Sequence, residues 1–177
     1  MHCPKCRNEV LKPAKLEEGL PAMGCPACDG ALLSLLYYRD WAERATLPSP
    51  EQTTNELSDE QDAKAALCCP KCSRIMTKYS IAGSVGTRLD LCGNCDEAWL
   101  DGGEWSTLKA LELAQKLPAV FSDQWQRRVR MERTELDRVE RLTRLVGHAD
   151  AEKAVDVKKW LASTANRAQI LHFLSIE

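Results

Sequence analysis

Long apolar runs and aromatic side chains are both scarce in this sequence. Of its 177 residues, 6% are aromatic and 28% are charged. No stretch approaches the roughly 20 consecutive apolar residues of a membrane-spanning helix, so we expect no membrane segment. With so little apolar material, the first two-thirds of the chain need a source of stability other than one large core.

The start of the chain lacks the apolar run of a signal peptide, since it reads Met1-His2-Cys3-Pro4. The cysteines number nine, and an odd count argues against a secreted scaffold of paired disulfides. Free thiols persist in a reducing compartment. We therefore expect a cytoplasmic protein.

A surplus of positive charge is also missing, because the formal net charge is −2. Ionising eight cysteines and adding two Zn²⁺ ions would change this to about −6. A general affinity for phosphate backbones is not expected from such a charge. The sequence also contains no nucleophile paired with a base and no phosphate-binding loop, so we do not expect an enzyme.

Eight of the nine cysteines form four CxxC pairs, and these pairs group into two modules of nearly equal spacing. Eighteen residues separate the two pairs of the first module and nineteen separate those of the second. A CxxC turn places two thiolates on one knuckle, and two knuckles complete a tetrahedral zinc site. The sequence therefore predicts two Zn²⁺ ions per chain, one held by Cys3, Cys6, Cys25 and Cys28 and the other by Cys69, Cys72, Cys92 and Cys95.

Several alternatives to this assignment stay open. Interleaved sites, with knuckles from different modules, would close a longer loop at a higher entropic cost. A dithiol redox couple would be expected as one CxxC pair beside a βαβ pattern, which this chain lacks. The ninth cysteine, Cys68, is either a small half-buried side chain or an alternative ligand and regulatory thiol. Because the cysteines already supply four ligands to each site, His2, His148 and His172 are expected to be surface or packing residues.

The two cysteine modules and the rest of the chain suggest four segments. Residues 1–45 are expected to form a ribbon-like zinc module, and residues 67–105 a second zinc ribbon. Residues 46–66 are rich in Pro, Ser, Thr, Glu and Asp, which predicts a flexible acidic linker. Residues 106–177 are expected to be helical. The predicted fold class is thus two small zinc-ribbon β modules, each with two knuckles, followed by an α-helical C-terminal region.

Helix signals are clearest in the second half of the chain. Asp101 and Glu104 resemble a capping box, which predicts a helix that stops before Pro118. Ser122 as N-cap and Gly147 as C-cap glycine bracket a predicted helix to Val146. A further helical stretch from about Asp150 to Leu174 is expected to break near Asn166. The apolar run after Cys28 fits a strand or a short helix, and periodicity does not decide between them.

The helix from Ser122 to Val146 carries two side-by-side stripes. One is apolar and needs burial, either against the following helix in a hairpin or against a second chain in a coiled coil. We favour the hairpin, because Glu132 and Glu135 interrupt the stripe. The apolar residues are Trp125, Val129, Leu136, Val139, Leu142 and Val146, and the arginine stripe comprises Arg127, Arg130, Arg133, Arg138, Arg141 and Arg144.

A family resemblance rests on the second module. It contains Cys69-Pro-Lys-Cys72, Met76, Asp90-Leu-Cys92-Gly-Asn-Cys95, Trp99-Leu-Asp101 and Gly103-Glu104. This pattern resembles the TFIIB-type zinc-ribbon family, small and mostly uncharacterised bacterial proteins. The resemblance implies that Cys69, Cys72, Cys92 and Cys95 are zinc ligands. The first module resembles the family through its four cysteines and Asp29-Gly30. The second module departs from the family at Asp96-Glu97-Ala98, where a glycine-rich turn is usual, and this departure concerns the geometry of the turn.

These features together suggest a structural zinc-binding adaptor that contacts a protein or nucleic-acid partner, with transcription as the favoured context. An arginine-rich face with Arg127, Arg130, Arg138 and Arg141 would contact nucleic acid, although i,i+4 ion pairs on a solvated helix explain the same charges. The alternatives are an assembly protein without nucleic-acid contact and a zinc or thiol redox sensor. The chain is expected to be a monomer, or a homodimer through its helical region.

Overall fold

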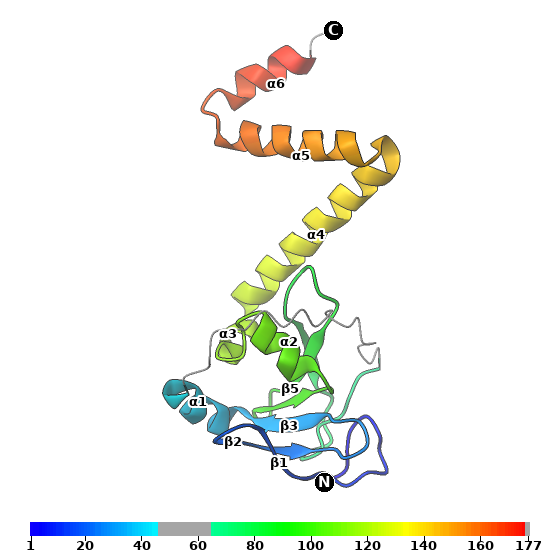
Figure 1. Ribbon diagram of the computed structural model, residues 1–177, viewed down its shortest axis with the longest axis vertical. Helices are drawn as coiled ribbons and strands as arrows, with labels where there is room; N and C mark the ends of the chain where they lie inside the picture. Colours follow the sequence, from blue (N-terminus) through cyan, green and yellow to red (C-terminus); the bar gives the residue numbers. More distant parts are fainter. Residues whose placement is uncertain (46–64, 176–177) are drawn as a thin grey trace. The chain divides into compact units, whose positions relative to one another are not determined.

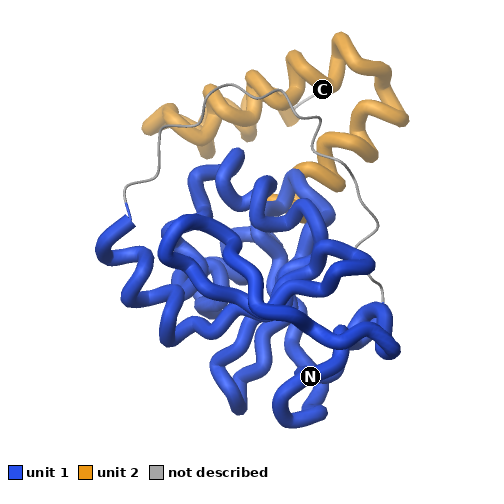
Figure 2. The backbone as a smooth tube through the Cα atoms, turned by 60° about the horizontal axis from the view of Figure 1, so that its bottom comes forward, with its two compact units in different colours: residues 1–131 blue, residues 132–177 orange. Residues whose placement is uncertain are grey.

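The computed structural model describes residues 1–45 and 65–175 (Figure 1). The chain divides into two compact units, residues 1–131 and residues 132–177 (Figure 2). The predicted linker, residues 46–66, lies outside the described residues except for its last two positions. Among the residues that the structure describes, no helix combines the length and apolar character needed to cross a membrane.

The first unit contains one antiparallel sheet of six strands in the order β1-β2-β3-β6-β5-β4. The first cysteine module contributes three strands and the second contributes the other three. The two modules therefore share one sheet, which the sequence did not indicate. The strands are β1 (Lys12–Glu17), β2 (Leu20–Gly24), β3 (Ala31–Ser34), β4 (Thr77–Ser80), β5 (Arg88–Cys92) and β6 (Glu97–Leu100).

The modules meet where β3 pairs with β6. Leu32 lies opposite Trp99, with Ala31 opposite Leu100 on one side and Leu33 opposite Ala98 on the other. Leu32 follows the last cysteine of its module by four residues, and so does Trp99. The register is therefore the one that an approximate two-fold axis through the Leu32–Trp99 pair would give.

Neighbouring residues of the central strands face opposite sides of the sheet. On one side, Leu33, Leu89 and Leu100 pack in a core with side chains of the helices that follow each module. On the other side, Leu32 and Trp99 pack among the cysteines. The helices are α1 (Leu35–Arg44), α2 (Glu104–Ala110) and α3 (Leu117–Val120).

The apolar segment that the sequence left undecided is both a strand and a helix, because β3 continues directly into α1. Tyr38 of α1 is buried, and its hydroxyl donates to the carbonyl of Ala114 and accepts from the N–H of Leu117. Trp41 packs edge-on against Trp105, with 5.8 Å between ring centroids. These contacts hold α1 against α2 and the segment that leads to α3.

Helix α2 begins as predicted, but it is shorter than predicted. The N–H of Asp101 donates to the Glu104 carboxylate at 2.8 Å, which is half of a capping box. The helix ends at Ala110, where Glu112 has a φ of 56° and Leu113 donates its N–H to the carbonyl of Leu108. This is a Schellman ending, a geometry that usually takes glycine, so it was not evident from the amino-acid pattern.

Helix α4 (Asp123–Val146) has the bounds that its capping residues predicted. Ser122 Oγ accepts the N–H of Trp125, and Gly147 adopts a φ of 82°. Its first turns belong to the first unit, where Trp125 Nε1 donates to the carbonyl of Ile81 at 3.0 Å. The first unit thus extends to residue 131, beyond the boundary at residue 105 suggested by the sequence.

The second unit contains the rest of α4, α5 (His148–Ser163) and α6 (Arg167–Ser175). The break between α5 and α6 includes Asn166, as predicted. Lys158 of α5 forms an ion pair with Glu135 of α4. The apolar stripe of α4 is buried at Val129, whereas Leu136 and Val146 remain 43% and 47% exposed. Within the described structure, the later half of the stripe lacks the cover expected of a closed hairpin.

Candidate metal centres

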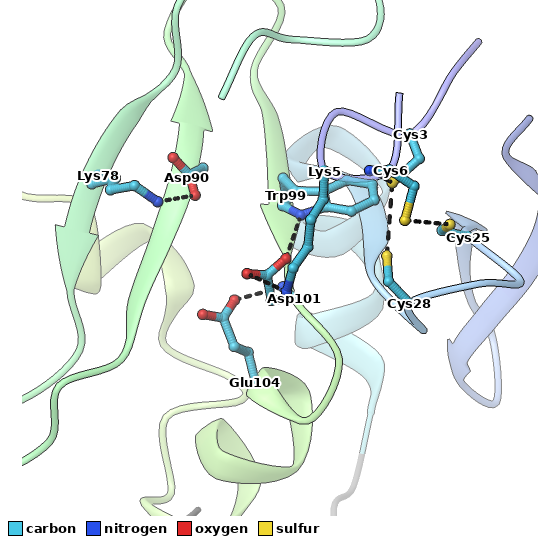
Figure 3. Close-up of polar contacts among 10 residues, drawn as sticks. All are labelled: Cys3, Lys5, Cys6, Cys25, Cys28, Lys78, Asp90, Trp99, Asp101 and Glu104. Atoms are coloured by element: carbon cyan, nitrogen blue, oxygen red, sulfur yellow. Dashed lines mark hydrogen bonds and ion pairs between the residues drawn. The ribbon is translucent and has the colours of Figure 1, made fainter. Parts of the chain in front are cut away.

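The first cysteine group lies where the N-terminal knuckle meets the turn between β2 and β3 (Figure 3). The Sγ atoms of Cys3, Cys6, Cys25 and Cys28 all lie within 4.8 Å of one another. Cys3 and Cys28 are 3.7 Å apart, and Cys6 and Cys25 are 4.0 Å apart. Four thiols this close could hold one metal ion between them.

The second group has the same arrangement. The Sγ atoms of Cys69, Cys72, Cys92 and Cys95 also lie within 4.8 Å of one another, and those of Cys72 and Cys92 are 3.6 Å apart. In both groups the first cysteine of each pair is buried and the second is half-buried. The structure brings all eight candidate cysteines together, and each group draws its cysteines from one module.

Each knuckle is closed by backbone hydrogen bonds. Arg7 donates its N–H to the carbonyl of Cys3 and Ser73 donates to that of Cys69, both at 2.8 Å. The residue after the second cysteine of each pair has a left-handed backbone, with φ between 54° and 63°. None of these residues is glycine, so the turn was not evident from the sequence. They are Arg7, Asp29, Ser73 and Asp96.

The thiols of each group differ in acidity. Burial raises the pKa of Cys69 to about 12 and also raises that of Cys28. By contrast, hydrogen bonds from the Arg74 N–H and the Cys95 thiol lower the pKa of Cys72 to about 7. The thiols of Cys69 and Cys28 therefore retain their protons near neutral pH unless a cation compensates the charge of their thiolates. A set of four sulfur ligands suits Zn²⁺ or iron, and not the oxygen-seeking Mg²⁺ or Ca²⁺.

A lysine occupies the same position in the first knuckle of each module. Lys71 Nζ lies 2.9 Å from a Glu97 carboxylate oxygen, and Lys5 Nζ lies 3.2 Å from one of Asp101. Burial acts to lower the pKa of Lys5, but the Asp101 carboxylate outweighs it and the pKa is raised. Both lysines therefore remain charged beside the thiols and favour their ionised form.

The apolar surroundings of both cysteine groups form one continuous cluster. Trp99 has no exposed surface and lies in the cluster beside Leu32. Its Nε1–H donates to Asp101, which also pairs with Lys5 (Figure 3). The sequence marked Trp99 as part of a motif, but not its place between two sites. The buried members of the cluster are Cys3, Leu11, Cys25, Leu32, Leu67, Cys69, Met76, Cys92 and Trp99.

Cys68 lies outside both groups and is exposed. Its backbone forms an antiparallel bridge with Ile75. His2 occupies the equivalent position in the first module and forms a bridge with Val10. The described part of the chain places no histidine in either group of four thiols.

Searches of protein-family models, curated proteins and solved structures return no match to this chain.

Proposed function

We propose that this chain is a structural zinc-binding protein with two tetrathiolate sites and no catalytic role. The observation that carries the proposal is the clustering of four Sγ atoms within 4.8 Å in each of two modules. Zinc is favoured over iron because paired CxxC knuckles about twenty residues apart are typical of structural zinc sites. Four thiolates also leave no ligand position for a substrate or water, as a catalytic zinc requires.

We further propose that each module is a zinc ribbon of the TFIIB type. The support is the motif around Trp99, whose parts have definite structural roles here. Trp99 donates to Asp101, and Glu104 accepts the N–H of Asp101 at the start of α2. The repeated knuckles and the three strands of each module agree with that proposal.

Metal analysis tests this proposal directly. Protein purified without added metal is expected to contain two zinc ions per chain by elemental analysis and by native mass spectrometry. The double variant Cys25→Ser/Cys28→Ser should lower the zinc content, whereas Cys68→Ser should leave two. Iron as the main metal, or a Cys68 variant that loses zinc, would contradict the assignment.

The second unit supports an adaptor role toward a protein partner. Among its described residues only Ala151 is buried, while Trp160 and Phe173 are 53% and 77% exposed. We take these two exposed side chains as the candidate contacts for that partner. A nucleic-acid partner is less well supported, because Arg133 pairs with Asp137 and Arg144 pairs with Glu140 on the arginine stripe.

Two assays separate these partners. Affinity capture from the native cell should retain a protein with the wild-type chain and lose it with Trp160→Asp/Phe173→Asp, while the surface control Lys153→Asp retains it. Gel-shift assays at two salt concentrations would detect nucleic-acid contact, because binding through phosphates weakens steeply with salt. Salt-sensitive binding that requires Arg127 and Arg141 would favour the nucleic-acid alternative. We also expect the protein to act in the cytoplasm.

A further inference from the structure

We propose that the two metal sites are coupled, so that filling either site raises the affinity of the other. This inference rests on the proposed metal binding and concerns its regulation. It derives from the junction of the two modules, where each site's second knuckle is supported by residues of the other module. The coupling requires no movement between distant parts of the molecule.

The first support is the strand pair itself. Strand β3 leaves the second knuckle of the first site and β6 leaves the second knuckle of the second site. The two strands pair over four consecutive residues, from Ala31 opposite Leu100 to Ser34 opposite Glu97. Because one knuckle orients each strand, ordering one knuckle also orders the strand against which the other module pairs.

The second support is the fit of the second module's tail on the first site. A Cβ atom added to Gly102 would lie 2.7 Å from the carbonyl oxygen of Cys28, and one added to Gly30 would lie 2.4 Å from the Trp99 ring. Both approaches are closer than a real side chain allows. Lys5 of the first knuckle also pairs with Asp101 of this tail. The loop holding Cys28 is therefore packed directly against the second module.

The third support is the reciprocal contact on the second site. Leu35 donates its N–H to the carbonyl of Asp96 at 2.9 Å, and Arg39 Nη1 lies 2.7 Å from the Asp96 carboxylate. Asp96 directly follows Cys95. Leu35 and Gly102 occupy equivalent positions, each seven residues after the last cysteine of its module. Each second knuckle is thus contacted by a residue that lies one or two positions after the last strand of the other module.

A chain with both sites empty must order these contacts when it binds its first metal ion, and the second ion then binds a knuckle that is already in place. Such coupling between sites commonly changes affinity by about 5- to 150-fold, and the change must be equal in both directions. We expect about tenfold or more. With equal intrinsic affinities, tenfold coupling would leave about a quarter of the chains singly loaded at half saturation, against about half for independent sites.

The test uses the full chain and zinc alone. The zinc affinity of the remaining site is measured by competition with a chromophoric chelator in Cys25→Ser/Cys28→Ser and in Cys92→Ser/Cys95→Ser. Each is compared with the second binding step of the wild type. Both variants should bind the remaining ion about tenfold or more weakly, and the two factors should agree. Native mass spectrometry at half saturation reports the singly loaded chain.

A matched glycine pair tests the junction with all eight cysteines intact. Gly102→Ala places a methyl group against the carbonyl of Cys28, whereas Gly93→Ala places one where no atom lies within 4 Å. The first variant should accumulate the singly loaded chain and the second should behave as the wild type. If the remaining site of both double variants binds zinc as tightly as the wild type binds its second ion, the coupling is overturned. The wild-type chain would still bind two zinc ions in that case, so the proposed function would stand. A wild-type chain that binds no metal would instead overturn the proposed function.

Discussion

The side-chain amide of Gln126 satisfies both backbone polar groups of Ser80. Its Oε1 accepts the N–H at 3.2 Å, and its Nε2 donates to the carbonyl at 2.9 Å. Ser80 ends β4, an edge strand of the sheet, and an edge presents unpaired backbone groups to solvent. Gln126 therefore acts at this point as a neighbouring strand would, and it attaches the start of α4 to the sheet.

Replacing Gln126 with alanine should destabilise the zinc-loaded first unit by about 1–3 kcal/mol, because two part-buried backbone groups lose their partner. Urea unfolding followed by tryptophan fluorescence measures the change. Gln124→Ala is the control, since Gln124 is exposed on the same helix. Equal stability of the two variants would show that the edge of β4 does not depend on this amide.

Removal of both metal ions with a strong chelator should abolish the near-ultraviolet circular dichroism of the first unit. The expectation follows because the apolar cluster around Trp99 includes four of the candidate ligands, and small metal-bound modules obtain much of their folding free energy from the metal. Added zinc should restore the signal. A near-ultraviolet spectrum unchanged by complete removal of metal would mean that the apolar contacts alone maintain the fold.

Glu17 provides a prediction about pH. Burial acts to raise the pKa of its carboxyl group, but Lys109 and the Trp105 Nε1–H outweigh this and lower it below the ordinary 4.5. Its contribution to stability is therefore fully present above about pH 4.5 and is lost as the pH falls through the lower folded-state pKa. Glu17→Gln should reduce the free energy of unfolding by about 1 kcal/mol.

The loss caused by Glu17→Gln should be the same at about pH 8 and at about pH 5.5, since the carboxylate is ionised at both. Thermal unfolding of both proteins in excess zinc, at each pH, measures the difference. Glu18→Gln serves as a neighbouring control, because Glu18 is exposed. A difference that shrinks between these pH values would mean that Glu17 titrates there and that Lys109 does not lower its pKa.

The oligomeric state is open to a simple measurement. We expect a monomer of 19.8 kDa by light scattering, since Glu132 and Glu135 interrupt the stripe that a symmetric helix pair would bury. Leu136→Asp/Val139→Asp should leave that mass unchanged, because Leu136 is already 43% exposed in the single chain. A wild-type mass near twice this value, halved by the double variant, would establish the helices as a dimer interface.

The parts of the fold that depend on local chemistry could be predicted from the sequence. Four repeated CxxC pairs indicated which cysteines gather. Ser122 and Gly147 gave the ends of α4, and Asn166 marked the break after α5. Each of these signals is contained within a few residues and follows from capping or turn chemistry. These local signals predict the structure correctly because no contact with a distant part of the chain overrides them.

The relationships that connect the modules could not be predicted in this way. The register of β3 on β6 depends on residues nearly seventy positions apart, and nothing in the apolar run after Cys28 identifies its partner. The role of Gln126 also depends on packing between elements. Sequence patterns indicate which side of a strand is buried, but not which strand will cover its edge.

The pairing of Leu32 with Trp99 has the symmetry of a homodimer although both residues belong to one chain. A self-complementary contact of this kind is the usual way in which two identical subunits meet. Carrying both copies on one polypeptide fixes their ratio at one to one and makes their association independent of protein concentration. Each copy is then free to diverge on its outer surface, so that one half can acquire a binding face while the other preserves the shared sheet.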